Sequence, residues 1–306
     1  MKKIASFTRS SLEIGNGHLV RMSQLISCLD TTDINVDFYC EYEQTPQWFL
    51  DVEHTKIAAK DFFEKDNSNY DLIIYDSYLD REKLKLIKNN ILLIDDFAYH
   101  GQYEFIKNIF DYNYGTNKKK YINKNLFLGT KYFPIGIRTY PEYIERKNFN
   151  INSNNILISI GGVSDDKLIN IDNLLKQVSK FGKIFLMDPL SKLKDYESSK
   201  IKVIQNKSLS SIMNNEEFKF GIFAGGTSKY IASAFCLPSF FIGRNELERI
   251  LISEFEKDNL SINLENEMKN LNSKNLEEQL FECHKKMSEL IDDDNSNRIN
   301  EAIKNL

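Results

Sequence analysis

The sequence predicts two α/β domains, each built on a parallel β-sheet. Short apolar runs alternate with amphipathic segments of helical spacing, and several runs are apolar at every position, which is typical of strands buried on both faces. This alternation breaks near residue 150 and then resumes. With 306 residues, the chain also exceeds the length over which a single hydrophobic core keeps growing.

The first half of the chain has the pattern β-α-β followed by further strands. The predicted elements are a strand at 4–7, a helix at 18–29, strands at 36–42 and 72–75, a helix at 79–88, and strands at 91–94 and 107–114. The strands at 72–75 and 91–94 are each followed by aspartate. The lysine triplet at 118–120 indicates a solvated loop or, as the alternative, an anion contact.

A linker separates the two halves. Gly136, Pro141 and the asparagine-rich stretch that ends at Asn155 interrupt the pattern, so we assign residues 1–147 to an N-terminal domain and 148–306 to a C-terminal domain with a helical tail. In the second domain we predict strands at 156–160, 183–187, 202–204, 220–223 and 239–242, and helices at 165–181, after Gly226 and at 276–290. We expect the helix at 276–290 to pack within the chain rather than on a partner, and a last short helix to follow it.

The composition is that of an ordinary globular protein and excludes several classes. Of the residues, 42% are hydrophobic and 12% aromatic, which is enough apolar area for two cores. A net charge of -4 argues against a dedicated nucleic-acid-binding protein. No apolar run approaches 18 residues and no signal-peptide core precedes Arg9, so we expect no transmembrane segment and a cytoplasmic location. The four cysteines have no C-x-x-C spacing and are expected to be buried thiols.

The segment 15–21, after the first strand, is the first candidate for a functional loop. Tandem α/β domains place the carboxyl ends of their sheets around a cleft, where such folds bind ligands. The segment reads G-N-G-H-L-V-R and opens the first helix, but Val20 stands where a dinucleotide fingerprint requires glycine. His18 is a candidate general base near neutral pH, with helix capping or packing as the alternative. His54, His100 and His284 lie in ordinary surface or helical contexts.

Two glycine loops in the second half are candidates for a phosphate site. Each follows an apolar strand and precedes a helix; their key residues are Gly161, Gly162 and Val163 in the first loop and Gly225, Gly226, Thr227 and Ser228 in the second. The alternative is that the glycines only make tight turns. No acidic cluster has metal-ligand spacing near these loops, and we expect neither a metal ion nor a cofactor.

Taken together, these motifs resemble the UDP-sugar hydrolase of pseudaminic acid biosynthesis, which has the two-domain GT-B architecture. The resemblance extends to about residue 245. It includes G-x-G-H-x-x-R at 15–21, Y-D-L-I-I-Y-D-S-Y at 70–78, L-I-D-D at 93–96, L-G-T-K-Y at 128–132, G-G-V-S at 161–164, A-G-G-T-S at 224–228 and L-P-S at 237–239.

The resemblance implies a GT-B-like fold, with two Rossmann-like domains whose parallel sheets face a cleft, and roles for individual residues. His18 would activate water for attack on the anomeric carbon, and Tyr78 would line the sugar site as the second catalytic position. Gly15, Gly17, Arg21, Asp76 and Asn245 would contact the substrate, and the two glycine loops would hold the nucleoside diphosphate.

The sequence departs from the family at three positions. Ser77 stands where the family usually has histidine, and Arg9 where it has an acidic or small residue. The helix after the second glycine loop lacks the glutamate that grips the nucleoside, and Ile231 cannot replace a carboxylate. Glu246 or Glu248 then takes that role, or the nucleotide differs, or binding has been lost.

The predicted function is hydrolysis of a nucleotide-activated, UDP-linked amino-deoxy sugar at its anomeric C–O bond, in nonulosonic acid or surface-glycan biosynthesis. The expected partner is therefore a small-molecule nucleotide sugar. The first alternative is an inverting glycosyltransferase of the same architecture, in which His18 deprotonates an acceptor hydroxyl. The second is a nucleotide-sugar-binding protein without catalytic activity.

Overall fold

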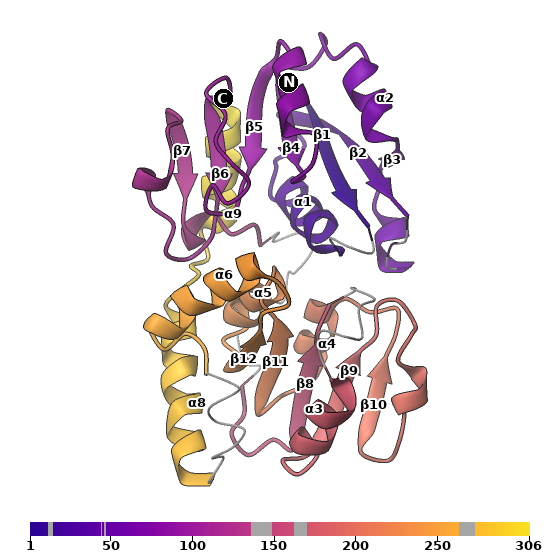
Figure 1. The fold of residues 1–306 in the computed structure, drawn as a ribbon, viewed down its shortest axis with the longest axis vertical. Helices are drawn as coiled ribbons and strands as arrows, with labels where there is room; N and C mark the ends of the chain where they lie inside the picture. The colour runs from indigo at the N-terminus through magenta and orange to yellow at the C-terminus, as the bar shows by residue number, and fades with distance from the viewer. Residues whose placement is uncertain (12–14, 44, 46, 136–148, 162–169, 263–272) are drawn as a thin grey trace. The chain divides into compact units, whose positions relative to one another are not determined.

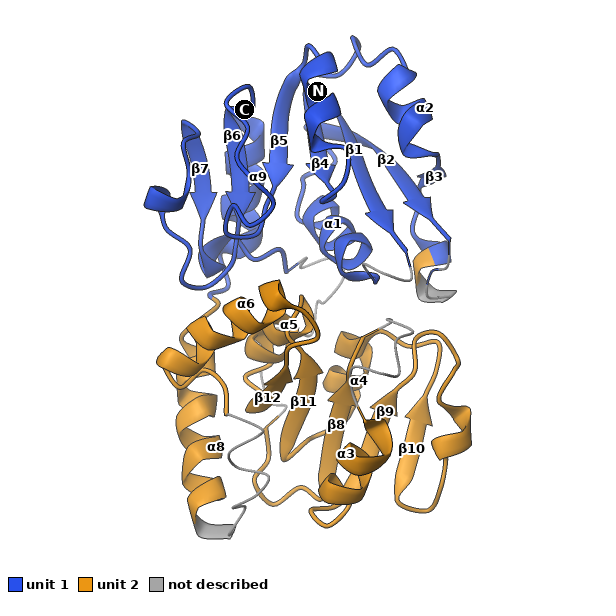
Figure 2. Ribbon diagram, in the orientation of Figure 1, with its two compact units in different colours: residues 1–45, 50–141, 292–306 blue, residues 46–49, 142–291 orange. Residues whose placement is uncertain are grey.

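Two parallel sheets, one in each half of the chain, organise the fold of the computed structural model (Figure 1). The structure describes residues 1–11, 15–43, 45, 47–135, 149–161, 170–262 and 273–306. The chain divides into unit 1, residues 1–45, 50–141 and 292–306, and unit 2, residues 46–49 and 142–291 (Figure 2). The predicted boundary between residues 147 and 148 lies outside the described residues.

Unit 1 contains a sheet of strand order β3-β2-β1-β4-β5-β6-β7 in its described part, with every neighbouring pair parallel. The strands are β1 (Lys2–Ser10), β2 (Ile34–Tyr42), β3 (Thr55–Lys56), β4 (Leu72–Asp76), β5 (Asn90–Ile94), β6 (Asn108–Asp111) and β7 (Asn125–Leu128). The helices are α1 (Gly17–Ser27), α2 (Ala59–Glu64) and α9 (Asn295–Lys304).

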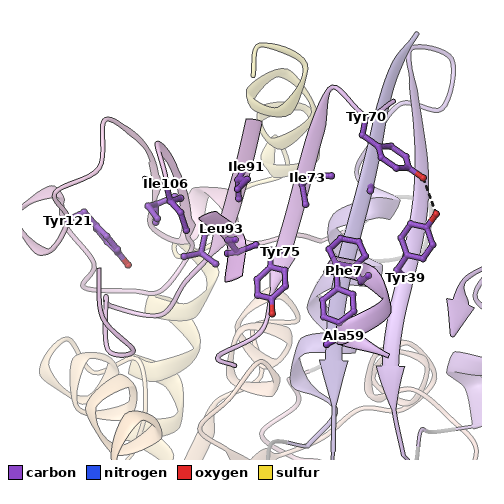
Figure 3. Packing of buried hydrophobic residues seen from close by; sticks show 14 residues of the cluster. Phe7, Tyr39, Ala59, Tyr70, Ile73, Tyr75, Ile91, Leu93, Ile106 and Tyr121 are labelled. Carbon is purple, nitrogen blue, oxygen red and sulfur yellow. Dashed lines mark hydrogen bonds between the residues drawn. The ribbon is translucent and has the colours of Figure 1, made fainter. Parts of the chain in front are cut away.

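The core of unit 1 is rich in aromatic side chains (Figure 3). Phe7 on β1 stacks on Tyr75 of β4 with ring centroids 5.4 Å apart. Tyr39 and Tyr70 pack in the same cluster and are joined by a hydrogen bond of 2.9 Å between their hydroxyls. Burial of these rings stabilises the sheet, and their hydroxyls keep hydrogen-bond partners inside it.

Unit 2 contains a second parallel sheet, of strand order β10-β9-β8-β11-β12 in its described part. The strands are β8 (Asn155–Ser159), β9 (Lys183–Met187), β10 (Ile201–Ile204), β11 (Phe220–Ala224) and β12 (Ser239–Ile242). The helices in the described part of this unit are α3 (Ile171–Val178), α4 (Leu209–Asn215), α5 (Ser228–Ala234), α6 (Glu246–Lys257) and α8 (Ser273–Ser288). The helix predicted at 165–181 is described only from residue 170 onward.

The last helix corrects the predicted domain assignment. We placed the whole helical tail in the C-terminal domain, but α9 belongs to unit 1. Asn295 donates to the carbonyls of Thr130 and Phe133, and the Nζ of Lys2 donates to the carbonyl of Ile303. These bonds to backbone carbonyls, together with burial of apolar residues on α9, fix the helix on unit 1, as the colours of Figure 2 show.

Two further expectations have clear outcomes. The segment predicted as a helix at 79–88 forms only a 3-10 helix, Arg81–Leu86, because Leu79 and Leu86 are exposed and do not form an apolar face. The four cysteines are free and buried, as predicted. Among the described helices, none combines the length and apolarity that crossing a bilayer requires.

Candidate functional site

The order of strands in unit 1 brings together polar residues from four distant parts of the sequence. In this sheet β1, β4, β5 and β6 are consecutive neighbours and all parallel, so their carboxyl ends lie side by side. His18 follows β1, Asp76 ends β4, Asp96 follows β5 and Asp111 ends β6. All four side chains are buried. The carboxyl edge of this sheet is therefore the candidate site of unit 1.

His18 and Asp76 form the first pair of this site. The imidazole Nδ1 lies 2.6 Å from Oδ1 of Asp76, and the histidine is only 4% exposed. Nδ1 also lies 3.0 Å from Nη2 of Arg21, which itself donates to Oδ1 of Asp76. Because the shorter contact of Nδ1 is to the carboxylate, which can only accept, we assign the proton of the neutral imidazole to Nδ1. The other nitrogen, Nε2, then has a lone pair and has no hydrogen-bond partner among the described residues. This arrangement is that of a general base whose orientation is fixed by a carboxylate.

Arg21 links Asp76 to the next carboxylate, Asp96. Its Nε donates to Oδ2 of Asp76 at 2.6 Å, its Nη2 donates to Oδ1, and its Nη1 donates to Asp96 at 2.9 Å. Burial alone would raise the pKa of each carboxyl, but Arg21 lowers the pKa of both below the usual value. Burial opposes the charge of Arg21, yet the two carboxylates raise its pKa well above the usual range. The three groups therefore stay charged.

Tyr78 lies beside His18 and is held by Asp96. Its hydroxyl donates to Oδ2 of Asp96 at 2.7 Å, and its ring meets the His18 ring edge to face with centroids 4.4 Å apart. Burial and the nearby Asp96 charge raise the pKa of Tyr78 well above 10. The phenol therefore stays protonated, and its ring is the part of Tyr78 that lies against His18.

Residues missed by the sequence analysis extend this site. The ring of His100 stacks on the ring of Tyr78, with centroids 3.9 Å apart. Burial lowers the pKa of His100. Asn113 donates to Asp96 at 2.6 Å and to Asp111 at 2.7 Å. Burial and the Asp96 charge raise the pKa of Asp111 to about 6. Aspartate after each apolar strand was the available signal, but it does not reveal which strands are neighbours.

The structure thus joins four predicted residues of unit 1 directly: His18, Tyr78, Arg21 and Asp76. Gly15 has a φ of 72°, a conformation that favours glycine, and its carbonyl accepts from Ser10 at 2.9 Å. Gly17 is the first residue of α1. In the described part of the chain, no three His, Cys, Asp or Glu side chains are grouped so that they could hold a metal ion.

The predicted glycine loops of unit 2 follow neighbouring strands. Gly161 comes after β8 and Gly225 directly after β11, and these two strands pair in parallel. Gly162 and Val163 lie outside the described residues. Gly225 packs against α6: a Cβ placed on it would lie 2.7 Å from Cδ1 of Ile252. A larger residue there would require the side chain of Ile252 to move.

Lys229 forms hydrogen bonds to the backbone of the second glycine loop. This side chain is 1% exposed, and its Nζ donates to the carbonyl of Gly225 at 2.8 Å and contacts that of Gly226 at 3.3 Å. Thr227 precedes α5 and makes no side-chain capping bond, and Ser228 is the first residue of that helix. Since a peptide N–H points opposite to the preceding carbonyl, the amides of Gly226 and Thr227 point away from Lys229.

Asn245 and the two glutamates near it lie on α6. Asn245 caps this helix, because its side-chain oxygen accepts from the backbone N–H of Glu248 at 2.8 Å. Glu248 is 6% exposed and forms an ion pair with Arg244, whereas Glu246 is exposed. The predicted sugar contact of Asn245 remains a prediction, and its amide oxygen is engaged by the helix.

Comparison of the sequence with protein-family models and with curated proteins finds no match. Solved structures do match. MnaA of Staphylococcus aureus with UDP has a TM-score of 0.63 at 12% identity over 99% of this chain and 96% of that chain. A candidate UDP-N-acetylglucosamine 2-epimerase from Listeria monocytogenes has a TM-score of 0.60 at 12% identity, over 99% of this chain and 96% of that chain. MurG from Acinetobacter baumannii has a TM-score of 0.60 at 10% identity over 100% of both chains. The likeness establishes the fold: two parallel-sheet α/β domains of the GT-B type, as predicted.

Proposed function

We propose that this protein is a nucleotide-sugar hydrolase that cleaves the anomeric C–O bond of a UDP-linked amino-deoxy sugar. The observation that carries the proposal is the buried pair of His18 and Asp76. The carboxylate holds the imidazole in the tautomer with a basic Nε2, which is the group that water activation requires. The sequence resemblance to the hydrolase of pseudaminic acid biosynthesis supports this substrate class.

The proposed reaction needs one proton acceptor and one stabilised leaving group. The Nε2 of His18 takes a proton from water while the water oxygen bonds to the anomeric carbon. The bond between that carbon and the diphosphate oxygen breaks, and its electron pair leaves with the nucleoside diphosphate. Asp76 stabilises the imidazolium that forms, since its carboxylate stays ionised beside Arg21.

The proposal assigns the diphosphate to unit 2. The amides of Gly226 and Thr227 point away from Lys229, and the hydroxyls of Thr227 and Ser228 are further donors for phosphate oxygens. The solved structures of similar fold include one with UDP and one, the rhamnosyltransferase SpnG, with thymidine diphosphate. Those ligands belong to those proteins, and they support a nucleoside diphosphate as the ligand class here.

A glycosyltransferase is the second candidate, because two of the proteins of similar fold, SpnG and SnogD, are glycosyltransferases. In that case His18 deprotonates an acceptor hydroxyl in place of water. The site of unit 1 does not favour one acceptor over the other, since Nε2 serves both.

The test is incubation of the pure protein with UDP-, CMP- and GDP-sugars in water enriched in oxygen-18, with and without acceptor alcohols. Hydrolysis at carbon releases free sugar and a nucleotide that contains no oxygen-18: a nucleoside diphosphate from UDP- and GDP-sugars, and CMP from CMP-sugars. Cleavage at phosphorus would place oxygen-18 in the nucleotide and contradict the proposed bond. Release only with an acceptor would identify a transferase, and no release with any donor would overturn catalysis of this type.

A further inference from the structure

Arg244 is a charged residue of unit 2 that the proposed function does not use. It follows β12, and its side chain is 16% exposed. Its Nη1 donates to the carbonyl of Ile160 at 3.2 Å, next to the first glycine loop. Because β11 lies between β8 and β12 in the sheet, the side chain crosses the carboxyl end of β11 to make this contact.

The two glycine loops leave room for this guanidinium. A Cβ placed on Gly161 would lie 2.7 Å from Nη1 of Arg244, and one placed on Gly226 would lie 4.0 Å from Nη2. Gly161 also has a φ of +83°, which other residues rarely adopt. The positive charge of Arg244 therefore lies against the backbone of both loops.

Glu248 fixes the orientation of this side chain. Its carboxylate accepts from Nε of Arg244 at 3.1 Å and from Nη2, and it also accepts from the Arg244 backbone N–H at 2.8 Å. With the bond to Ile160, three of the five guanidinium N–H groups are used. The other two, one on Nη1 and one on Nη2, have no acceptor among the described residues.

We propose that Arg244 binds the diphosphate of the substrate through these two N–H groups. An arginine held at its Nε side presents a rigid pair of donors whose spacing matches two oxygens of a phosphate group. The ion pair with Glu248 preorganises the donors, so little side-chain freedom is lost when the ligand binds. This inference rests on the proposed function, because it takes its ligand to be the nucleoside diphosphate of that reaction.

The contact with Arg244 also determines the role of Glu248. Its carboxylate is engaged by Arg244 at both oxygens and is buried, so it does not serve as the ribose-binding glutamate. Glu248 is instead a positioning residue for the phosphate contact, and of the two glutamates considered for the nucleoside, Glu246 is the one with an exposed side chain.

The test compares Glu248→Gln with the double variant Arg244→Gln/Glu248→Gln, so that the two proteins differ only in the guanidinium and neither contains a buried carboxylate without its arginine. Calorimetry measures binding of UDP, inorganic pyrophosphate and uridine, and circular dichroism confirms that both variants are folded. We expect the double variant to bind UDP and pyrophosphate between about tenfold and a hundredfold more weakly than Glu248→Gln, with uridine binding unchanged. Arg249→Gln, at an exposed arginine on α6, is the matched control and should bind like wild type.

The outcomes separate this inference from the proposed function. Equal UDP binding by the two Gln variants would overturn the role of Arg244 and leave the hydrolase proposal standing. UDP binding that depends on Arg244 without release of sugar would support the inference and contradict the hydrolase. A wild-type protein that binds neither UDP nor pyrophosphate would overturn both.

Discussion

The imidazole of His18 shares the carboxylate of Asp76 with the guanidinium of Arg21, and Asp76 has no exposed surface. The histidine is thereby tied to a charge that stays negative at neutral pH, because Arg21 outweighs the effect of burial on the pKa of Asp76. The proposed function uses this relationship in two ways: Asp76 would hold the proton on Nδ1, and Nε2 would accept a proton in the reaction. The first predictions follow from these two roles.

Replacing His18 by alanine should abolish turnover and leave nucleotide affinity nearly unchanged. His18 belongs to unit 1, whereas the residues proposed for the diphosphate all belong to unit 2. We expect kcat to fall by about 10²-fold or more. Turnover and calorimetric binding of UDP are measured on the same protein, with His54→Ala as the control histidine in unit 1, where its ring bonds Tyr42. Loss of UDP binding together with turnover would show that His18 is a ligand contact.

Replacing Asp76 by asparagine should affect both catalysis and stability. The amide is nearly the same size but no longer fixes the proton on Nδ1, so we expect turnover to fall by about 10²-fold. Arg21 also loses one of its two charged partners in a buried site and keeps Asp96, so the loss in the free energy of unfolding should be at most about 3–5 kcal/mol. Urea unfolding and turnover are the measurements, and Asp80→Asn, which alters a more exposed ion pair, is the control. Unchanged turnover would exclude the proposed orientation of His18.

Most of the fold follows from residue patterns that have a physical basis. Strands such as 72–75 and 91–94 are apolar at every position because helices and loops cover both faces of a parallel sheet. The α-helix predicted at 79–88 is wrong, which shows that the spacing of apolar residues does not by itself predict a helix. Leu79 and Leu86 are exposed, whereas Arg81 is buried and pairs with Asp95. The sequence pattern places helix α9 in the C-terminal domain, whereas its hydrogen bonds join it to backbone carbonyls of unit 1. The spacing of apolar residues along a helix does not indicate which distant carbonyls its polar side chains will contact.

The candidate site was predictable only in part. His18, Asp76 and Arg21 were predicted because they lie in two motifs next to strands. Asp96 and Asn113 join them through strand order, and strand order is a long-range property of the sheet. The adjacent aspartates Asp95 and Asp96 resemble one acidic pair in the sequence, yet they bond different arginines. Contacts of this kind depend on tertiary structure.

Tyr78→Phe should keep turnover within about an order of magnitude of wild type. The hydroxyl already donates to Asp96, and its raised pKa keeps it protonated, so we expect Tyr78 to act through its ring. The variant should lose up to about 1.5–3 kcal/mol of stability, because a partly buried hydrogen bond to a charged group is removed. Tyr78→Ala should lower kcat/KM further, since the ring that contacts both His18 and His100 is gone. A phenylalanine variant as inactive as the alanine variant would show that the hydroxyl itself takes part in the reaction.

Acid should act on the buried carboxylates in two opposite ways. Asp96 has a lowered pKa in the folded protein, so its contribution to stability is fully present above about pH 4 and is lost as the pH falls further. Asp111 has a pKa raised to about 6, so its ionisation destabilises the folded state above pH 6, and this cost disappears as the pH falls from about 6 to 4.

The free energy of unfolding, measured by urea titration from pH 7 to pH 3, tests both signs. In Asp111→Asn, the gain between pH 6 and pH 4, up to about 3 kcal/mol, should be absent relative to wild type. In Asp96→Asn, part of the decline below pH 4 should be absent. An Asp111→Asn profile parallel to that of wild type would contradict the raised pKa.

The nucleotide site should discriminate weakly among bases. The helix after the second glycine loop has no carboxylate to grip the nucleoside, and Glu248 is engaged by Arg244. A hydrogen-bonding site discriminates through the groups that a wrong ligand leaves unpaired, and donors that contact only phosphate leave none unpaired when the base changes. In competition calorimetry with UDP, CDP, GDP and ADP, we therefore expect the four affinities to differ by less than about a hundredfold.

Thr227→Val should weaken the binding of all four nucleotides about equally, by roughly 0.5–3 kcal/mol, because its hydroxyl is proposed to bond phosphate. A preference for UDP above a hundredfold would require a nucleoside contact, and Glu246→Gln would then show whether the exposed glutamate at the start of α6 supplies it.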